Sequence, residues 1–352
     1  MNKDSQTFLV DLLSTPSPSG QEMQIQKKWI KYVTPYADEI RTDMAGNAIA
    51  ILNPQAPFKV MIAGHCDEIG FIVNRIDEQG FVYVDKLGGI SPKPAIGMKV
   101  QILGSKGTIT GVIGANAEHH GGVKDGLEMS DIFIDCGAKS RVEVTQYVQI
   151  GDLAVYQRSV EFLMNNRISG RGLDNRTGAF LAAEVIRKLS DRKPQVGIYA
   201  VSTVNEETNM GGAYFAGAGI QPNMAVAVDV TFATDYPGVD PRKHGDIRLD
   251  GGPVLAKGAP IHYKVNNLLE ESAKRLGISL QYELTPRRTG TDADQIRLTG
   301  RGVPIALVSL PLRYMHSPVE TVSLKDLQQE IDLLVEFALH LTGNENLNPL
   351  ED

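Results

Sequence analysis

The sequence predicts an α/β fold: a mixed, parallel-rich sheet with helices on both faces, interrupted by an inserted small β-barrel domain. Before residue 69 and after residue 160, apolar runs typical of strands alternate with segments of helical periodicity. That alternation is typical of a parallel-rich sheet covered by helices. In between, short alternating runs are separated by Gly and Pro about every ten residues, which favours a small antiparallel β domain.

The N-terminal part of the chain predicts two helices followed by two strands. Residues 17–20, Ser-Pro-Ser-Gly, interrupt the helical pattern, and Ser19 is the expected N-cap of the second helix. Apolar runs at 48–52 and 60–63 predict strands, and the second run leads directly into His65. The residues that carry the helical spacing are Leu9, Leu12 and Leu13, and then Ile25, Trp29, Ile30 and Val33.

The remaining elements fall into two groups. Residues 69–160, the expected inserted domain, show no helical periodicity, and strands are expected at 71–76, 81–84, 99–103, 107–113 and 132–134. After Arg167, helices are expected at 177–189, 212–217, 266–276 and 324–341. The strands expected between those helices lie at 196–204, 224–230, 279–284 and 304–309. Residues 1–68 and 161–352 would then form one α/β domain around the insertion.

Composition and charge exclude several function classes. Lys and Arg number 35 against 42 Asp and Glu, so the net charge is −7, and Trp29 is the one tryptophan. A nucleic-acid-binding protein needs a basic face, which this balance does not supply. No apolar stretch is long enough to span a bilayer or to form the core of a secretion signal. Cys66 and Cys136 supply neither a disulfide framework nor a C-x-x-C zinc motif, so we expect a cytoplasmic protein.

Side chains of metal-ligand type follow four of the expected strands. The carboxyl ends of strands meet at one edge of an open α/β sheet, so these side chains are expected to lie together. Asp174 precedes an expected helix and can point at the same edge. Imidazole with carboxylate oxygen suits zinc, cobalt or manganese. The residues that follow the strands are His65, Glu206 with Glu207, Asp229 and His316.

Each of these residues has a plainer interpretation when taken alone. A histidine at a strand end is more often a hydrogen-bonded structural residue, and Asp174 can act as a helix N-cap. Glu206 and Glu207 can lie in a solvated loop. Asp229 is hardest to explain in this way, because a carboxylate in an apolar run is costly unless it is paired or bound to metal. Together, the residues favour a metal site.

Six motifs in order give the chain a resemblance to a known family. They are H-x-D-E-I-G at 65–70, G-x-D-N-R at 172–176, E-E at 206–207, V-D at 228–229, G-T-D-A at 290–293 and M-H-S-P-x-E at 315–320. Over essentially its whole length the chain resembles the tetrahedral aminopeptidase and glutamyl aminopeptidase family of di-metal metallopeptidases. The resemblance implies that 1–68 and 161–352 form the catalytic domain. It also implies that the inserted domain is PDZ-like and mediates oligomerisation.

The resemblance also implies roles for the clustered residues. Asp174 would bridge two divalent metal ions, zinc or cobalt, and Glu206 would be the general base and acid. Asp67 would accept the second N–H of His65 and thereby fix its tautomer. The bond between Asp174 and Asn175 would be a cis peptide. The other metal ligands would be His65 and Asp229 on one ion, and Glu207 and His316 on the other.

The implied activity is that of a metal-dependent aminopeptidase, which hydrolyses the N-terminal residues of short peptides through a metal-bridging water. Asp292 would meet the free α-amine of the substrate. The chain departs from the family pattern at 204–212, 244–252 and 287–288. Arg248 and Arg288, in the last two of these segments, are candidate substrate-binding residues. Because an arginine fork suits a carboxylate or an amide oxygen, these arginines predict a preference for substrates with Glu or Gln side chains. The alternative, that both arginines are solvated surface residues, is about equally well supported.

The departures leave other functions open. They suggest a divergent branch, associated with osmoprotectant dipeptide systems, that would act as an amidase or deacylase on an acylated amino acid or dipeptide. A family member labelled endoglucanase is a weaker alternative, because metal-bound carboxylates cannot easily face each other across a glycosidic bond. A scaffold without activity is disfavoured, since every ligand type is present. The resemblance implies homo-oligomers built from dimers, up to twelve subunits. His119 and His120 would lie in a solvated loop or at a neighbour's active site.

Overall fold

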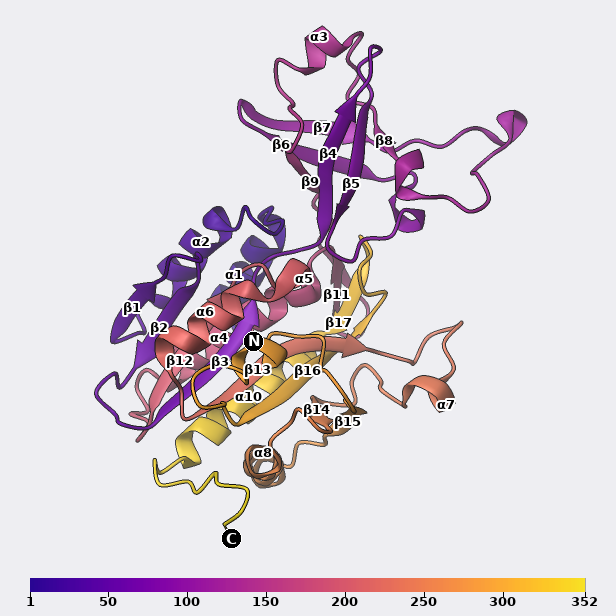
Figure 1. Ribbon diagram of the computed structural model, residues 1–352. Coiled ribbons are helices and arrows are strands. Elements are labelled where there is room, and N and C mark those ends of the chain that lie inside the picture. Colours follow the sequence, from indigo (N-terminus) through magenta and orange to yellow (C-terminus); the bar gives the residue numbers. More distant parts are fainter. Residues whose placement is uncertain (352) are drawn as a thin grey trace.

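The computed structural model describes residues 1–351 and confirms the predicted fold class: a large mixed sheet between helices, from which a smaller sheet projects (Figure 1). The four strands at the centre of the large sheet are parallel neighbours, and the flanking strands are mainly antiparallel. The order across the large sheet is β1 (Glu39–Thr42), β2 (Ala48–Leu52), β12 (Gly197–Thr203), β3 (Lys59–His65), β13 (Met224–Phe232), β16 (Ile305–Arg313), β17 (Glu320–Ser323), β11 (Arg167–Gly170) and β10 (Glu161–Leu163). Two further strands continue from β16: β14 (Val254–Lys257) pairs with β16 and β15 (Gln281–Leu284) pairs with β14.

Helices cover both faces of this sheet. Consecutive residues of its buried strands point to opposite faces, and each face therefore has an apolar core that helices cover. In β3, Val60 and Ile62 join one apolar cluster, while Met61 and Ala63 join the other. The first core is covered by α1 (Lys3–Ser14), α2 (Met23–Val33), α4 (Leu173–Leu189), α8 (Tyr263–Leu276) and α10 (Leu324–His340). The second is covered by α6 (Gly211–Ile220) and the one-turn α9 (Ala293–Ile296). The remaining short helices of this part are α5 (Glu206–Asn209) and α7 (Pro241–His244).

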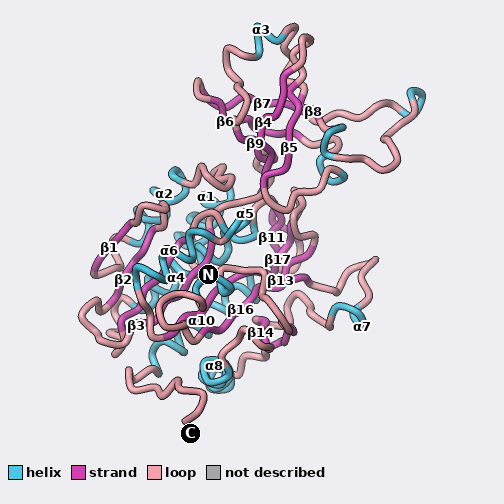
Figure 2. Tube along the Cα trace, in the orientation of Figure 1, coloured by secondary structure: helices cyan, strands magenta, loops and turns pink. Residues whose placement is uncertain are grey.

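The projecting sheet stands apart from the large sheet (Figure 2), and its strands pair antiparallel. It has its own apolar core. Val112, at the end of β7, also pairs with Asp135, next to β8, so the two outer strands meet and the sheet is nearly closed. Its strand order is β7 (Gly107–Val112), β6 (Lys99–Gly104), β9 (Leu153–Tyr156), β4 (Gly70–Ile76), β5 (Val82–Leu87) and β8 (Phe133–Ile134). Unlike the sequence-based expectation, the segment also holds short helical turns: η1 (Lys93–Ala95), η2 (Glu118–His120), η3 (Met129–Asp131) and α3 (Arg141–Val144).

Two further local expectations were wrong. Ser19 does not cap the second helix, because α2 begins at Met23 with Glu22 at the N-cap position. The Ser19 hydroxyl instead donates to Asp67 Oδ2 at 2.6 Å. The helix expected from residue 177 already begins at Leu173, with a kink at Asp174 and Asn175.

Several strands carried too little pattern to be predicted from the sequence. Strands β1, β10, β11, β14 and β17 span at most four residues, too few to establish an alternation. Within residues 1–351, none of the helices is both long enough and apolar enough to cross a membrane.

Candidate metal centre

The predicted ligand residues meet at the carboxyl edge of the central parallel strands. Strand β3 ends at His65, which is paired in register with Thr203 at the end of β12. Ala63 pairs with Ala227, so His65 and Asp229 lie at the same level on adjacent strands. The structure brings six such residues together, which we call the carboxylate–histidine cluster: His65, Asp174, Glu206, Glu207, Asp229 and His316.

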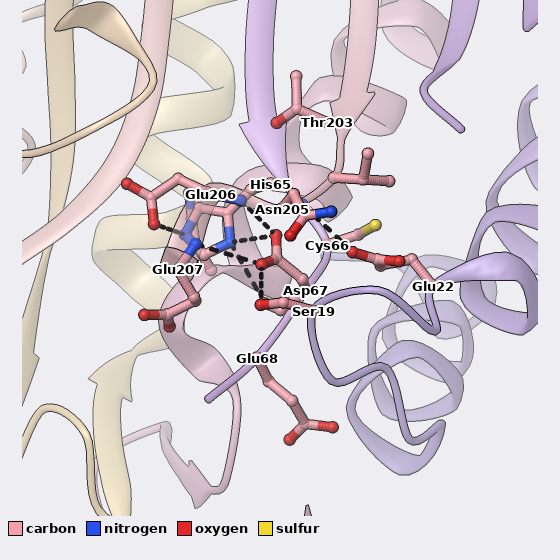
Figure 3. A network of polar contacts seen from close by, with 12 residues as sticks. Ser19, Glu22, His65, Cys66, Asp67, Glu68, Thr203, Asn205, Glu206 and Glu207 are labelled. Atoms are coloured by element: carbon pink, nitrogen blue, oxygen red, sulfur yellow. Dashed lines mark hydrogen bonds and ion pairs between the residues drawn. The ribbon is translucent and has the colours of Figure 1, made fainter. Parts of the chain in front are cut away.

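His65 occupies one half of this cluster. Its Nε2 atom lies 3.4 Å from Asp174 Oδ1, 3.7 Å from Glu206 Oε2 and 4.0 Å from Asp229 Oδ1. The imidazole is almost fully buried, with 1% of its surface exposed. The side-chain atoms of Glu206 and His65 approach each other at the end of β3 (Figure 3). Three carboxylates therefore surround one buried imidazole nitrogen.

His316 occupies the other half, on the loop between β16 and β17. Its Nε2 atom lies 3.3 Å from Asp174 Oδ2 and 3.6 Å from Glu207 Oε2. The two oxygens of Asp174 thus face two different histidines. A carboxylate placed in this way has the geometry of a ligand shared between two centres.

Asp67 holds both halves in position from behind. His65 Nδ1 lies 3.3 Å from Asp67 Oδ1, on the side of the ring opposite to Asp174. The backbone N–H groups of Glu206 and Glu207 donate to the two oxygens of Asp67 at 3.1 and 3.2 Å. Burial alone would raise the pKa of Asp67, but the hydrogen bonds from His65 and Ser19 hold it below its usual value. Figure 3 shows this network around Asp67, with Glu68 lying apart from it.

If all the carboxylates of the cluster were ionised, they would carry more negative charge than their surroundings balance. Burial, together with the neighbouring carboxylates, raises the pKa of Glu206 to about 10. Burial also raises the pKa of Glu207 and Asp229 well above their usual values. Burial would raise the pKa of Asp174 too, but hydrogen bonds from both histidines lower it. Among residues 1–351, the ion pairs made by these carboxylates are with the two histidines, so the cluster lacks a permanent positive charge.

The residues fit divalent metal ions. Donor atoms of His65, Glu206 and Asp229 lie within 4.8 Å of one another, and the same holds for His65, Asp174 and Glu207. Glu207 Oε1 is buried without a hydrogen-bond partner, which is costly unless a cation meets it. Imidazole nitrogen and carboxylate oxygen are the donors that zinc and cobalt accept. Because Glu206 belongs to one of these groups, the distances alone do not decide whether Glu206 is a metal ligand or a general base.

Sequence reasoning missed two groups that position the cluster. Glu320 accepts from the backbone N–H of His316 at 2.9 Å and from that of Asp174 at 3.2 Å. The carbonyl oxygen of Gly89 lies 3.2 Å from His316 Nδ1. A Cβ atom added to Gly89 would lie 2.5 Å from the His316 ring, so only glycine fits there. The signals were Glu320 within the last motif and the Gly-Gly pair at 88–89.

The kinked N-terminal end of α4 is held by a separate buried network. The peptide bond between Asp174 and Asn175 is cis. Arg176 pairs with Glu68, which also pairs with Arg171, and all three side chains are buried. Arg176 therefore stabilises the N-terminal end of α4. Glu68 was not singled out by sequence reasoning, although it lies within the first motif.

A cavity of about 600 Å³ opens onto the cluster. Of the three predicted substrate-binding residues, Arg288 lines it. Asp292 is buried and accepts from the Thr203 hydroxyl, and it is not among the lining residues. The structure does not bring Arg248 into the cavity: its guanidinium is exposed and pairs with Asp246 at 2.7 Å. Lining residues that sequence reasoning did not select include Thr231, Phe232, Glu283, Leu307 and Met315.

Comparison with known proteins identifies the family. Residues 46–333 match the family model described as M42 glutamyl aminopeptidase. The lysyl aminopeptidase of Pyrococcus furiosus is 34% identical over 92% of this chain and 93% of its own. A solved TET aminopeptidase from a marine sediment Thaumarchaeota archaeon has a TM-score of 0.90 at 30% identity, covering 97% of this chain and 98% of that one.

A second solved structure agrees. It is the Pyrococcus horikoshii TET1 peptidase, described as assembling into a tetrahedron or a large octahedral shell. Its TM-score is 0.85 at 28% identity, and the match covers 96% of this chain and 100% of that one. These matches confirm the resemblance given by the six motifs. The chain therefore belongs to the M42 glutamyl aminopeptidase family and is a metallopeptidase.

Proposed function

We propose that this protein is a metal-dependent aminopeptidase that removes N-terminal residues from short peptides. The observation that carries the proposal is the position of Asp174, whose two oxygens face His65 and His316, beside the buried carboxylate of Glu206. A peptidase of this kind needs cation sites and a base within reach of one water molecule. Family membership supports the same reaction class.

The proposal places two divalent ions, zinc or cobalt, in the carboxylate–histidine cluster. His65 and Asp229 would hold one ion, Glu207 and His316 the other, and Asp174 both. When bound, such ions polarise the scissile carbonyl and lower the pKa of water.

Glu206 is the proposed proton carrier. It would accept the proton of the attacking water and pass it to the leaving amine, as a general base and then a general acid. Asp67 contributes by position: it accepts from both glutamate N–H groups and lies against His65 Nδ1, which leaves Nε2 free to act as a ligand. Glu320 holds the backbone of Asp174 and His316 in the same way.

Metal analysis combined with a substrate panel tests this function. The purified protein is assayed for zinc and cobalt, and then for hydrolysis of aminoacyl amides, short peptides and their N-acetylated forms. An aminopeptidase cleaves the free amines and is inactive after chelation. Faster cleavage of N-acetylated substrates would instead favour the amidase or deacylase alternative.

Metal addition is expected to stabilise the protein more at about pH 8 than at about pH 5. The raised pKa values of Glu206, Glu207 and Asp229 mean that the folded, metal-free chain binds protons that the unfolded chain has released. Its stability therefore falls as pH rises above the unfolded-state pKa values. Bound cations replace these protons, so the gain grows with pH.

Scanning calorimetry of chelator-treated protein, with and without added zinc or cobalt, measures this gain. The difference in Tm at each pH removes the contribution of groups outside the cluster. A gain that is largest at low pH would contradict the assignment of Glu207 and Asp229 as ligands.

We further propose that the protein is a dimer-based homo-oligomer of up to twelve subunits, assembled through residues 69–160. The TET1 peptidase of Pyrococcus horikoshii is described as a large assembly. In this chain the projecting segment, residues 69–160, carries exposed apolar side chains suited to an interface: Val112, Val123, Val142, Tyr147 and Ile150.

Joining residue 68 to residue 161 through a short linker is expected to give a chain that no longer assembles. The projecting sheet has its own core, so its removal leaves the large sheet and its two cores intact. Light scattering of the purified deletion chain, beside the full chain, measures the particle mass. Oligomers of full size from the deletion chain would show that assembly uses another surface.

A further inference from the structure

Glu283 is fixed in the same cavity as the metal centre. It lies on β15, and its Oε1 accepts from the Ser309 hydroxyl at 2.8 Å, while the Thr231 hydroxyl donates to its Oε2. Ser309 is the register partner of Asp229 on the neighbouring strand. Thr231 follows Asp229 by two residues in β13, which is roughly 6.6 Å along a strand. Glu283 is thus hydrogen-bonded to two residues that lie beside Asp229, a proposed metal ligand.

The Glu283 carboxylate has no cationic partner in the described chain. Among residues 1–351, no ion pair joins it to a lysine, arginine or histidine, and its contacts are the two hydroxyls. Burial raises its pKa, and the two hydroxyl donors only partly offset this. Metal ions in the proposed positions would be met by other carboxylates and would leave Glu283 unpaired. A carboxylate held in this way is suited to a positive charge supplied by a ligand.

We propose that Glu283 binds the ammonium or guanidinium group of an N-terminal Lys or Arg side chain, and so gives the enzyme a preference for basic N-terminal residues. The inference rests on the proposed aminopeptidase function and specifies its substrate class. The scissile bond would lie at the carboxylate–histidine cluster, and the side chain would extend along β13 toward Glu283.

The walls of the cavity that Glu283 lines suit the aliphatic part of such a side chain. Phe232, Leu307 and Met315 line the metal-centre cavity. A second cavity of about 790 Å³ adjoins it and shares Thr231, Phe232 and Glu283 with the first. The methylene groups of Lys or Arg can pack on apolar surface while the charged head reaches a polar partner. Glu283 therefore lies where a long side chain has room.

Arg288 lines the same cavity and supports the opposite expectation, a preference for Glu or Gln. Its side chain is exposed, however, whereas Glu283 is partly buried and held by two hydrogen bonds. A charge interaction is weaker in solvent than in a desolvated site. A held carboxylate also needs no reordering to meet its partner. These differences favour Glu283 as the residue that selects the side chain.

Lysyl and norleucyl 4-nitroanilides provide a matched test, because norleucine has the same four-carbon side chain as lysine but lacks its terminal ammonium group. The metal-loaded full chain is assayed as wild type, as Glu283→Gln and as the control Glu271→Gln, which changes an exposed glutamate on α8. The wild type is expected to have the higher kcat/KM for the lysyl substrate. In Glu283→Gln the lysyl-to-norleucyl ratio should fall about ten- to a hundredfold, the contribution of one charge-assisted hydrogen bond. Glu271→Gln should keep the wild-type ratio.

The remaining outcomes separate this inference from the function on which it rests. A wild type that cleaves norleucyl or glutamyl substrates faster than lysyl ones overturns the inference and leaves the aminopeptidase intact. An equal loss on every substrate in Glu283→Gln also overturns it, because Glu283 would then not distinguish between side chains. No cleavage of any substrate by metal-loaded wild type defeats the proposed function itself. If the variant does not fold, calorimetric binding of free lysine against norleucine to wild type decides, with tighter lysine binding expected.

Discussion

Glu206→Gln is expected to lower turnover by about 10²–10⁴-fold while both metal ions remain bound. Gln is nearly isosteric with Glu but cannot accept the proton of the attacking water. KM should change little, because the groups that bind the carbonyl and the amine are left in place. Steady-state kinetics with metal analysis of the same preparation measures both effects.

Glu207→Gln is the matched comparison, because the neighbouring glutamate belongs to the other half of the cluster. Glu207 Oε2 lies 3.6 Å from His316 Nε2, and its Oε1 has no hydrogen-bond partner. Gln at this position replaces an anionic ligand with a neutral one, so affinity should drop at one metal site. Excess metal should partly restore activity, which it cannot do for Glu206→Gln.

Metal titration by calorimetry on the two variants decides between the roles. The distinction matters because the Glu206 carboxylate also lies close enough to His65 and Asp229 to share a metal ion with them. If Glu206→Gln loses an ion and Glu207→Gln keeps two, the assigned roles are reversed.

The cluster could be predicted from the sequence because parallel strands deliver their carboxyl ends to one edge. His65, Glu206, Glu207 and Asp229 all belong to or follow long, mainly apolar strands that can be recognised from their own sequence. In contrast, Glu283 comes from the four-residue strand β15, which within residues 1–351 pairs with β14 alone. Nothing in the local sequence indicates that this strand reaches the metal centre.

The same reasoning explains why the contribution of the projecting sheet was missed. Gly89 lies 227 residues before His316 in the sequence, and only the folding of the chain brings the two residues together. Arg248 shows the converse. It was selected for its residue type in an unusual segment, but Asp246, two residues away, supplies a local partner on the surface. The kind of group that Arg248 can bind follows from its residue type, but the sequence does not show whether its loop turns toward the cavity or toward solvent.

Asp174→Asn is expected to have the largest effect of all, a loss of activity of at least about 10⁴-fold together with the loss of both metal ions. Asp174 is the residue that contacts both histidines, through Oδ1 on one side and Oδ2 on the other. Asn offers one carbonyl oxygen without charge and turns an N–H donor toward the other site. Each ion would therefore lose an anionic ligand, or meet a group that repels it.

Asp229→Asn provides the control, because Asp229 faces His65 alone. It should weaken one site and leave the other, so that the bound metal falls from two ions to one at moderate metal concentration. Metal stoichiometry by elemental analysis and calorimetry, beside thermal denaturation to confirm folding, compares the two variants. The shared-ligand geometry requires Asp174→Asn to lose the second ion as well. An Asp174→Asn protein that keeps one ion at wild-type affinity would show that the two halves of the cluster bind metal independently.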